Sequence, residues 1–104
     1  MRLISQDRSI DIPYENFVVE RENSIIKIDI GNCGVLVPVG IYSSEEKALK
    51  VMEMVRNSYA KFILFQTIYQ NGVLEKLTKE LGENEALNIV TPIFHFPKDS
   101  EVEV

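Results

Sequence analysis

The fold is decided by Tyr42-Ser-Ser-Glu-Glu-Lys-Ala-Leu-Lys-Val-Met-Glu-Met-Val-Arg-Asn-Ser-Tyr59, which opens a long helix after a series of strands. Ser43 and Glu46 have the spacing of a capping box, in which a hydroxyl and a carboxylate each accept a hydrogen bond from a free backbone N–H. Apolar residues then recur three or four positions apart, which places them on one helix face. They are Ala48, Met52, Val55, Tyr59 and Phe62. We predict a helix from Ser44 to about Tyr69.

The second half of this helix is apolar almost all the way round. It reads Tyr59-Ala-Lys-Phe-Ile-Leu-Phe-Gln-Thr-Ile-Tyr69. A helix that is apolar on every side must be covered on every side, and a chain of 104 residues has little other structure to cover it. We therefore expect a homo-oligomer that packs through this helix. The alternative is a kink near Asn57-Ser58, with two helices that pack separately.

The segments before the helix predict an N-terminal antiparallel β-meander. Residues 24–30 alternate, with Ile26, Ile28 and Ile30 on one face, as in a strand that buries one side. Gly31-Asn-Cys-Gly34 tolerates the positive φ angles of a tight hairpin. The other predicted strands are 3–5, 17–21 and 35–41, with a turn at 22–24.

Two prolines limit where the strands of this meander can be regular, because proline cannot donate a hydrogen bond to a neighbouring strand. Residues 11–16 contain Pro13 and form an edge strand, a bend or a connector. Pro38 indicates an edge strand or a bulge.

After the long helix, the sequence predicts a helix stop at Asn71-Gly72 and a short second helix from Val73 to Leu81. A final strand covers Ala86 to Phe96, bent at Pro92, and an acidic tail follows. The chain is therefore expected to be one α+β domain over residues 1–104.

Charge and composition exclude several classes of partner. The formal net charge is −5, whereas phosphate contacts with duplex nucleic acid need clustered Lys and Arg, and an anionic membrane surface is disfavoured for the same reason. No apolar run approaches the roughly 20 residues that span a bilayer, and residues 1–8 lack the apolar core of a signal peptide. We expect a cytoplasmic protein. Cys33 and His95 are the single residues of their types, which excludes an intrachain disulfide and a His/Cys zinc site within one chain.

We expect no enzyme and no cofactor. His95 lies between two phenylalanines with no visible partner to orient it as a base, and Cys33 has neutral neighbours in a turn. The carboxylates of Asp7, Asp11 and Glu15 are either an acid/base or metal group or, more commonly, a solvated face. No phosphate-binding Gly motif and no Ser-centred elbow occurs.

The candidate ligand-binding residues are basic and aromatic. Arg56 precedes Tyr59 and Phe62 by one and two helical turns, and such a group can stack a base and pair with phosphate. Lys27 and Arg21 supply further positive charge from the strands. In the alternative interpretation Tyr59 and Phe62 belong only to the buried stripe, and Arg56 is its solvated shoulder.

Three segments together resemble short proteins encoded by phages and prophages of Gram-positive bacteria. They are Leu3-Ile-Ser-Gln-Asp-Arg-Ser-Ile-Asp-Ile-Pro-Tyr-Glu15, the stretch from Tyr42 to Arg56, and Phe94-His-Phe-Pro-Lys-Asp-Ser-Glu-Val-Glu103. Among these proteins, the chain resembles the first-described family of Thoeris anti-defence sponges. The resemblance implies an oligomer that sequesters a cyclic ADP-ribose isomer without cleaving it. It also implies an Arg and aromatic rings around the ligand, for which Arg56 is the best match.

The sequence leaves three functional hypotheses. The first is a phage anti-defence protein that binds and sequesters a cyclic nucleotide signal. The second is a phage-encoded inhibitor that binds a host protein directly through its acidic face and tail. The third is nucleotide hydrolysis by the N-terminal carboxylates with a metal ion.

Overall fold

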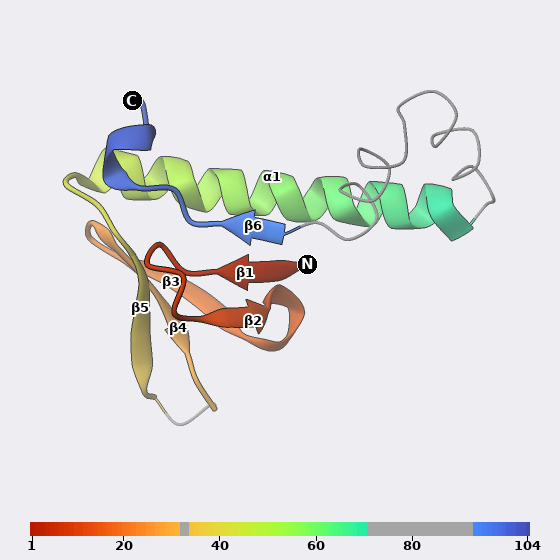
Figure 1. Ribbon diagram of the computed structural model, residues 1–104, viewed down its shortest axis with the longest axis horizontal. Coiled ribbons are helices and arrows are strands. Elements are labelled where there is room, and N and C mark those ends of the chain that lie inside the picture. Colours follow the sequence, from red (N-terminus) through yellow and green to blue (C-terminus); the bar gives the residue numbers. More distant parts are fainter. Residues whose placement is uncertain (32–33, 71–92) are drawn as a thin grey trace.

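In the computed structural model, the chain forms an α+β fold around one long helix (Figure 1). The structure describes residues 1–31, 34–70 and 93–104, without the side chains of 68–70. The elements are β1 (Arg2–Ile4), β2 (Asp11–Pro13), a 3₁₀ helix (Tyr14–Asn16), β3 (Val18–Glu22), β4 (Ile25–Asp29), β5 (Leu36–Ile41), α1 (Glu45–Gln70), β6 (Ile93–His95) and a second 3₁₀ helix (Asp99–Glu101). The predicted fold class is confirmed. Cys33, the stop at 71–72, the short helix at 73–81 and the first part of the final strand at 86–92 lie outside the described residues.

The strands form two small sheets. β3, β4 and β5 are an antiparallel meander in that order, as predicted. β1 and β2 form an antiparallel hairpin in the other sheet, whose order is β2-β1-β6. Its third strand, β6, runs parallel to β1, so that Arg2 lies opposite Ile93. The last described strand therefore completes a sheet that the first strand begins.

β5 contains the irregularity that Pro38 predicts. Ile26 lies opposite Gly40 and Lys27 lies opposite Pro38, so Val39 is the extra residue of a bulge. β5 is also an edge strand of the described sheet. Both features place the residue that lacks an N–H where a ladder bond is not needed.

The helix begins one residue later than the capping box predicted. The Lys47 N–H donates to Ser44 Oγ at 3.2 Å, so Ser44 is the cap and the Ser43/Glu46 assignment is wrong. The Ser43 N–H instead donates to Asp99 Oδ1 at 2.8 Å. A carboxylate from the C-terminal segment therefore takes the donor that the capping box assigned to Glu46. α1 then runs as one helix through residues 57 and 58, so the kinked alternative is also wrong.

The core lies between α1 and the two sheets. Ala48, Val51 and Val55 are buried on the helix face that packs on β3 and β4, where Ile26 and Ile28 are fully buried. The apolar stripe is confirmed at Ala48 and Val55, and the alternation of β4 at Ile26 and Ile28; the predicted stripe did not include Val51, and Met52 is only partly buried. Ile30 is 41% exposed, because β4 ends at Asp29 and the chain turns at Gly31.

The second sheet and the C-terminal segment complete this core. Leu3 from β1 and Phe94 from β6 are opposite each other and both are buried. Phe96 and Val102 are buried beyond β6. The phenylalanine rings pack edge to face, with centroids 5.3 Å apart, and His95 is exposed between them in the sequence.

Polar contacts fasten the C-terminal segment to the rest of the fold. The Tyr42 hydroxyl and the Gln6 side-chain amide both donate to the Pro97 carbonyl, at 2.9 and 3.1 Å. Lys47 Nζ donates to the Asp99 carbonyl at 2.9 Å. The loop after β1, the end of β5 and the start of α1 thus meet at residues 97–99.

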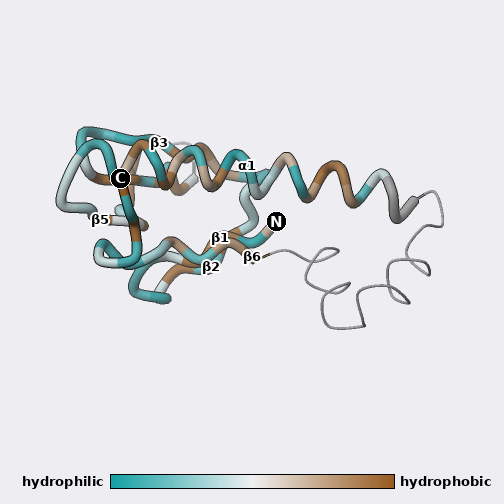
Figure 2. The backbone as a smooth tube through the Cα atoms, turned by 90° about the horizontal axis from the view of Figure 1, so that it is seen from above, coloured by the Kyte–Doolittle hydropathy of each residue, from teal (hydrophilic) through white to brown (hydrophobic). Residues whose placement is uncertain are grey.

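The outer half of α1 extends past the described strands (Figures 1 and 2). Figure 2 shows an apolar band on this half. Ile63 and Leu64 are 44% and 58% exposed within one chain. The predicted surplus of apolar helix surface is therefore present on the described side chains, and the predicted homo-oligomer stays a prediction.

Candidate functional site

The candidate site is an aromatic cluster, defined here as Tyr14, Tyr59 and Phe62. The Tyr59 ring lies between the other two, with centroids 4.6 Å from Tyr14 at 50° and 6.1 Å from Phe62 at 60°. All three side chains are partly buried, and all three pack against the edge of the core. Such tilted and edge-to-face pairs are favourable arrangements of aromatic rings.

Tyr14 reaches this cluster because of the bend after β2. Pro13 is the last residue of β2, and Tyr14 begins the 3₁₀ helix. The Tyr14 N–H donates to the Met1 carbonyl at 2.9 Å, which ties the bend to β1. Tyr14 is not among the site residues that the sequence predicts. No periodicity connects it with Tyr59; the only signal is its position directly after a proline.

Arg56 lies beside the cluster on α1 and is exposed. On an ideal helix it is rotated about 60° from Tyr59 and about 120° from Phe62, so Tyr59 is the aromatic neighbour of its guanidinium. No hydrogen bond or ion pair joins Arg56 to any residue that the structure describes. Its guanidinium is thus available to an anion that also contacts Tyr59.

Arg21 and Lys27 lie on opposite faces of the meander. Arg21 is opposite Ile26 on the side of α1, and its Nη1 donates to Asn23 O at 2.8 Å and to Glu45 Oε1 at 3.0 Å. Lys27 points away from α1, and its Nζ donates to Glu22 Oε2 at 2.9 Å. Each cation already has an acidic partner. The structure therefore brings Tyr59 and Phe62 together with Tyr14 and leaves Arg56 one helical turn before Tyr59, while Arg21 and Lys27 do not come into one site.

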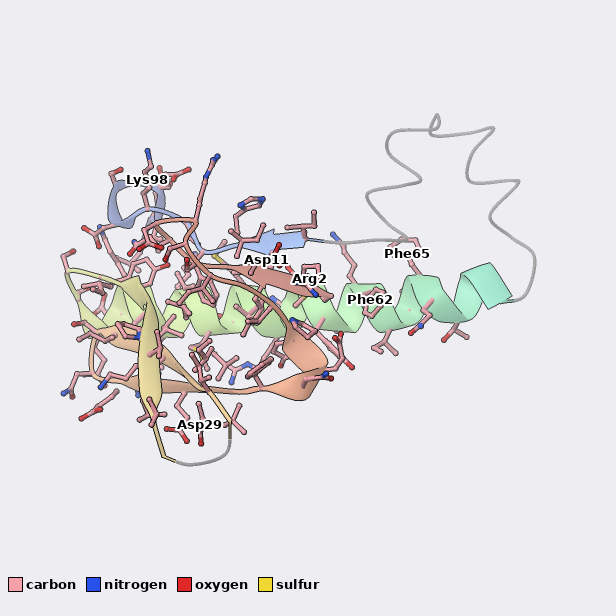
Figure 3. All side chains as sticks on the ribbon, turned by 60° about the horizontal axis from the view of Figure 1, so that its bottom comes forward. Arg2, Asp11, Asp29, Phe62, Phe65 and Lys98 are labelled. Atoms are coloured by element: carbon pink, nitrogen blue, oxygen red, sulfur yellow. The ribbon has the colours of Figure 1, made fainter. Side chains whose placement is uncertain are left out.

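The N-terminal carboxylates have separate partners. Asp7 accepts hydrogen bonds from the Ser9 hydroxyl and N–H and from the Ser5 hydroxyl, which together lower its pKa to about 2. Asp11 pairs with Arg2 at 2.8 Å, and Glu15 pairs with the N-terminal ammonium at 2.6 Å (Figure 3 labels Arg2 and Asp11). Within the described ranges, no three His, Cys, Asp or Glu side chains gather as ligands for a metal ion.

Two further observations concern the whole described chain. None of its helices is both long and apolar enough to span a bilayer. No protein-family model, no curated protein and no solved structure matches the sequence.

Proposed function

We propose that this protein acts by binding and holding a small anionic ligand with a planar ring, and that it does so at Arg56 and the aromatic cluster. The observation that carries the proposal is an exposed guanidinium without a described partner, next to the partly exposed ring of Tyr59. A base stacked on an aromatic side chain contributes about 1–3 kcal/mol. A guanidinium adds charge-assisted, bidentate hydrogen bonds to phosphate.

The surrounding charge favours a compact ligand over a polymer. The chain carries a net charge of −5, so a long polyphosphate backbone is repelled wherever it leaves the immediate neighbourhood of Arg56. A cyclic nucleotide presents one ring system and few phosphates, which one arginine and a few aromatic rings can bind.

The resemblance to Thoeris anti-defence sponges supplies the specific ligand. We propose that the chain sequesters a signal of the cyclic ADP-ribose isomer type, without cleaving it, in the cytoplasm of an infected bacterium. We also propose that two or more copies associate through the outer half of α1. The exposed Ile63 and Leu64 support that association, because large apolar patches on a single chain commonly mark interfaces.

Direct inhibition of a host protein is the second candidate function. The observation in its favour is a set of exposed apolar side chains on the meander, at Val18, Leu36 and Ile41. These residues lie on β3 and β5, away from the aromatic cluster.

Release of an intact ligand distinguishes the candidates. The protein is incubated with a cyclic ADP-ribose isomer, freed of unbound small molecules and then denatured by heat, and the released compounds are identified by mass spectrometry. A protein that sequesters the ligand releases it unchanged, and a protein that hydrolyses it releases a product. A protein that acts only by inhibiting another protein leaves all of the ligand in solution and releases none. Arg56→Ala should lower the amount of ligand recovered. Lys50→Ala is its matched control, because it removes one exposed positive charge from a different side of the same helix.

A further inference from the structure

The side of the meander turned away from α1, which we call the outer face, is an apolar surface that no described residue covers. In the strand register, Ile41 pairs with Ile25 and Leu36 pairs with Asp29. The side chains of all four residues project from the other face of the sheet than the buried Ile26 and Ile28. Val18 extends the outer face onto β3, opposite Asp29. Val18, Leu36 and Ile41 are 51%, 38% and 58% exposed. Exposed apolar side chains gathered on β3 and β5, the two strands that flank β4, are typical of a binding surface.

The charges on the outer face determine which partner fits it. Glu22 and Lys27 neutralise each other at 2.9 Å. Glu20 and Asp29 form no ion pair with any described residue, so two negative charges remain. Asp29 Oδ1 is also shielded from solvent and has no described hydrogen-bond partner. Figure 3 shows Asp29 near the end of the β4–β5 hairpin.

These charges argue against a second copy of the chain as the occupant. Two identical faces packed about a two-fold axis bring the same surface together twice, so both sides of the contact carry the same net negative charge. Juxtaposed like charges are unfavourable at an interface. The phosphates of a nucleic acid are disfavoured for the same reason.

The edge of β5 is closed to strand addition from Pro38 to Ile41, so along this part the face itself is the accessible surface. Gln6 runs alongside the end of β5: its N–H donates to the Val39 carbonyl at 2.8 Å, and its side chain accepts from Ile41 N at 2.9 Å and donates to Ile41 O at 3.2 Å. Pro38 has no N–H to offer. A partner can therefore approach β5 over its side chains but not by adding a strand along this part of it.

We propose that the outer face is a docking surface for a second protein whose contact region presents apolar side chains flanked by Lys or Arg. The apolar side chains cover Val18, Leu36 and Ile41. The cations pair with Glu20 and Asp29, which have no such partner within the described chain. This surface is separate from Arg56 and the aromatic cluster, so it does not depend on the ligand proposed above.

Two synthetic peptides test the docking chemistry. One alternates Leu and Lys over about ten residues, and the other alternates Leu and Glu. Each is titrated at about 150 mM salt, where the Debye length is about 8 Å and long-range attraction is screened, into ¹⁵N-labelled protein followed by NMR. The Leu–Lys peptide should shift resonances of β3, β4 and β5, and the Leu–Glu peptide should bind at least tenfold more weakly.

Matched variants locate the site. The double variant Val18→Thr/Ile41→Thr should bind the Leu–Lys peptide about tenfold more weakly, because apolar contact area is lost. Asp29→Asn should also weaken it while the fold is kept. Leu49→Gln, at an exposed apolar residue in the first half of α1, is the control and should leave the affinity unchanged.

Three results would overturn the proposal: equal binding of both peptides, shifts confined to α1, or equal affinity of the wild type and the Thr variants. A change in oligomeric state caused by the Thr variants would identify the outer face as a contact between copies and would also overturn it.

Discussion

Substituting Gly40 by alanine tests the packing where β5 meets the C-terminal segment. A Cβ atom at this position would lie 2.8 Å from Tyr42 Cε2 and 3.1 Å from the Tyr42 hydroxyl oxygen. Tyr42 is only 4% exposed, and its hydroxyl donates to the Pro97 carbonyl. The ring therefore cannot move aside without disturbing both the core and that hydrogen bond.

Three effects set the size of the loss. Overpacking of a filled core costs about 1–3 kcal/mol, and loss of the Tyr42–Pro97 hydrogen bond costs about 0.5–1.5 kcal/mol. Alanine also restricts the unfolded chain, which offsets about 0.4–1 kcal/mol. We expect Gly40→Ala to lower the free energy of unfolding by about 2 kcal/mol, which corresponds to a fall in Tm of roughly 8–16 °C for a domain of this size.

Urea denaturation of four proteins separates these effects: wild type, Gly40→Ala, Tyr42→Phe and the double variant. Tyr42→Phe keeps the ring and removes the hydrogen bond, while Gln6 still donates to the Pro97 carbonyl. In the Tyr42→Phe background the alanine should cost about 1 kcal/mol less, because that hydrogen bond is already absent. An alanine variant as stable as the wild type would show that the Tyr42 ring does not lie over Gly40.

The remaining predictions address the cap, the N-terminal turn, the outer half of α1 and the ligand. Ser44→Ala should cost about 1 kcal/mol in urea melts, as loss of a helix cap does, whereas Ser43→Ala should stay within about 0.5 kcal/mol. Asp7 contributes stability that is fully present above pH 3.8 and is lost as the pH falls through about 2; Asp7→Asn should flatten the stability profile between these values, and an unchanged profile would refute the role of its hydrogen bonds. Leu64→Asp should dissociate the proposed oligomer in light scattering without lowering the Tm of the single chain, because Leu64 is exposed there; a wild type that is already monomeric at micromolar concentration contradicts the oligomer. Arg56→Ala should weaken the binding of a cyclic ADP-ribose isomer about ten- to hundredfold, as measured by calorimetry, and Arg56→Lys should recover part of the lost affinity. Equal affinities of the wild type and Arg56→Ala would remove Arg56 from the site.

The sequence predicted the features that depend on near neighbours. The helix stripe and the alternation of β4 are local patterns, and residues such as Val55 and Ile28 lie on the predicted buried faces. The bulge at Pro38 followed from a missing N–H. These features need no knowledge of distant parts of the chain.

Features that depend on distant residues were missed. Two adjacent serines are equally good caps by composition, and Asp99 determines which of them is used by accepting the Ser43 N–H. The pairing of β1 with β6 joins residues at the two ends of the sequence. In the candidate site, Arg56 and Tyr59 are a helical neighbour pair that a pattern can identify, but the contact of Tyr59 with Tyr14 depends on the bend after Pro13.

The turn between β3 and β4 explains why Arg21 and Lys27 lie on opposite faces of the meander. With Asn23 at positive φ, the β3–β4 hairpin pairs Arg21 with Ile26. A shift of one residue would have placed Arg21 and Lys27 on the same side. Side-chain type identified both cations, but only the register determined their faces.

The pairing of β1 with β6 has a consequence for synthesis of the chain. Ribosomes add about 5–20 residues per second, so β1, and most of α1 with its apolar stripe, exist for several seconds before Phe94, Phe96 and Val102 are made. Until then the nascent chain lacks one strand of a sheet and three core side chains. Folding of this domain therefore cannot finish until residues 94–102 have been synthesised, and the growing chain exposes apolar surface to chaperones and to other nascent chains throughout that interval.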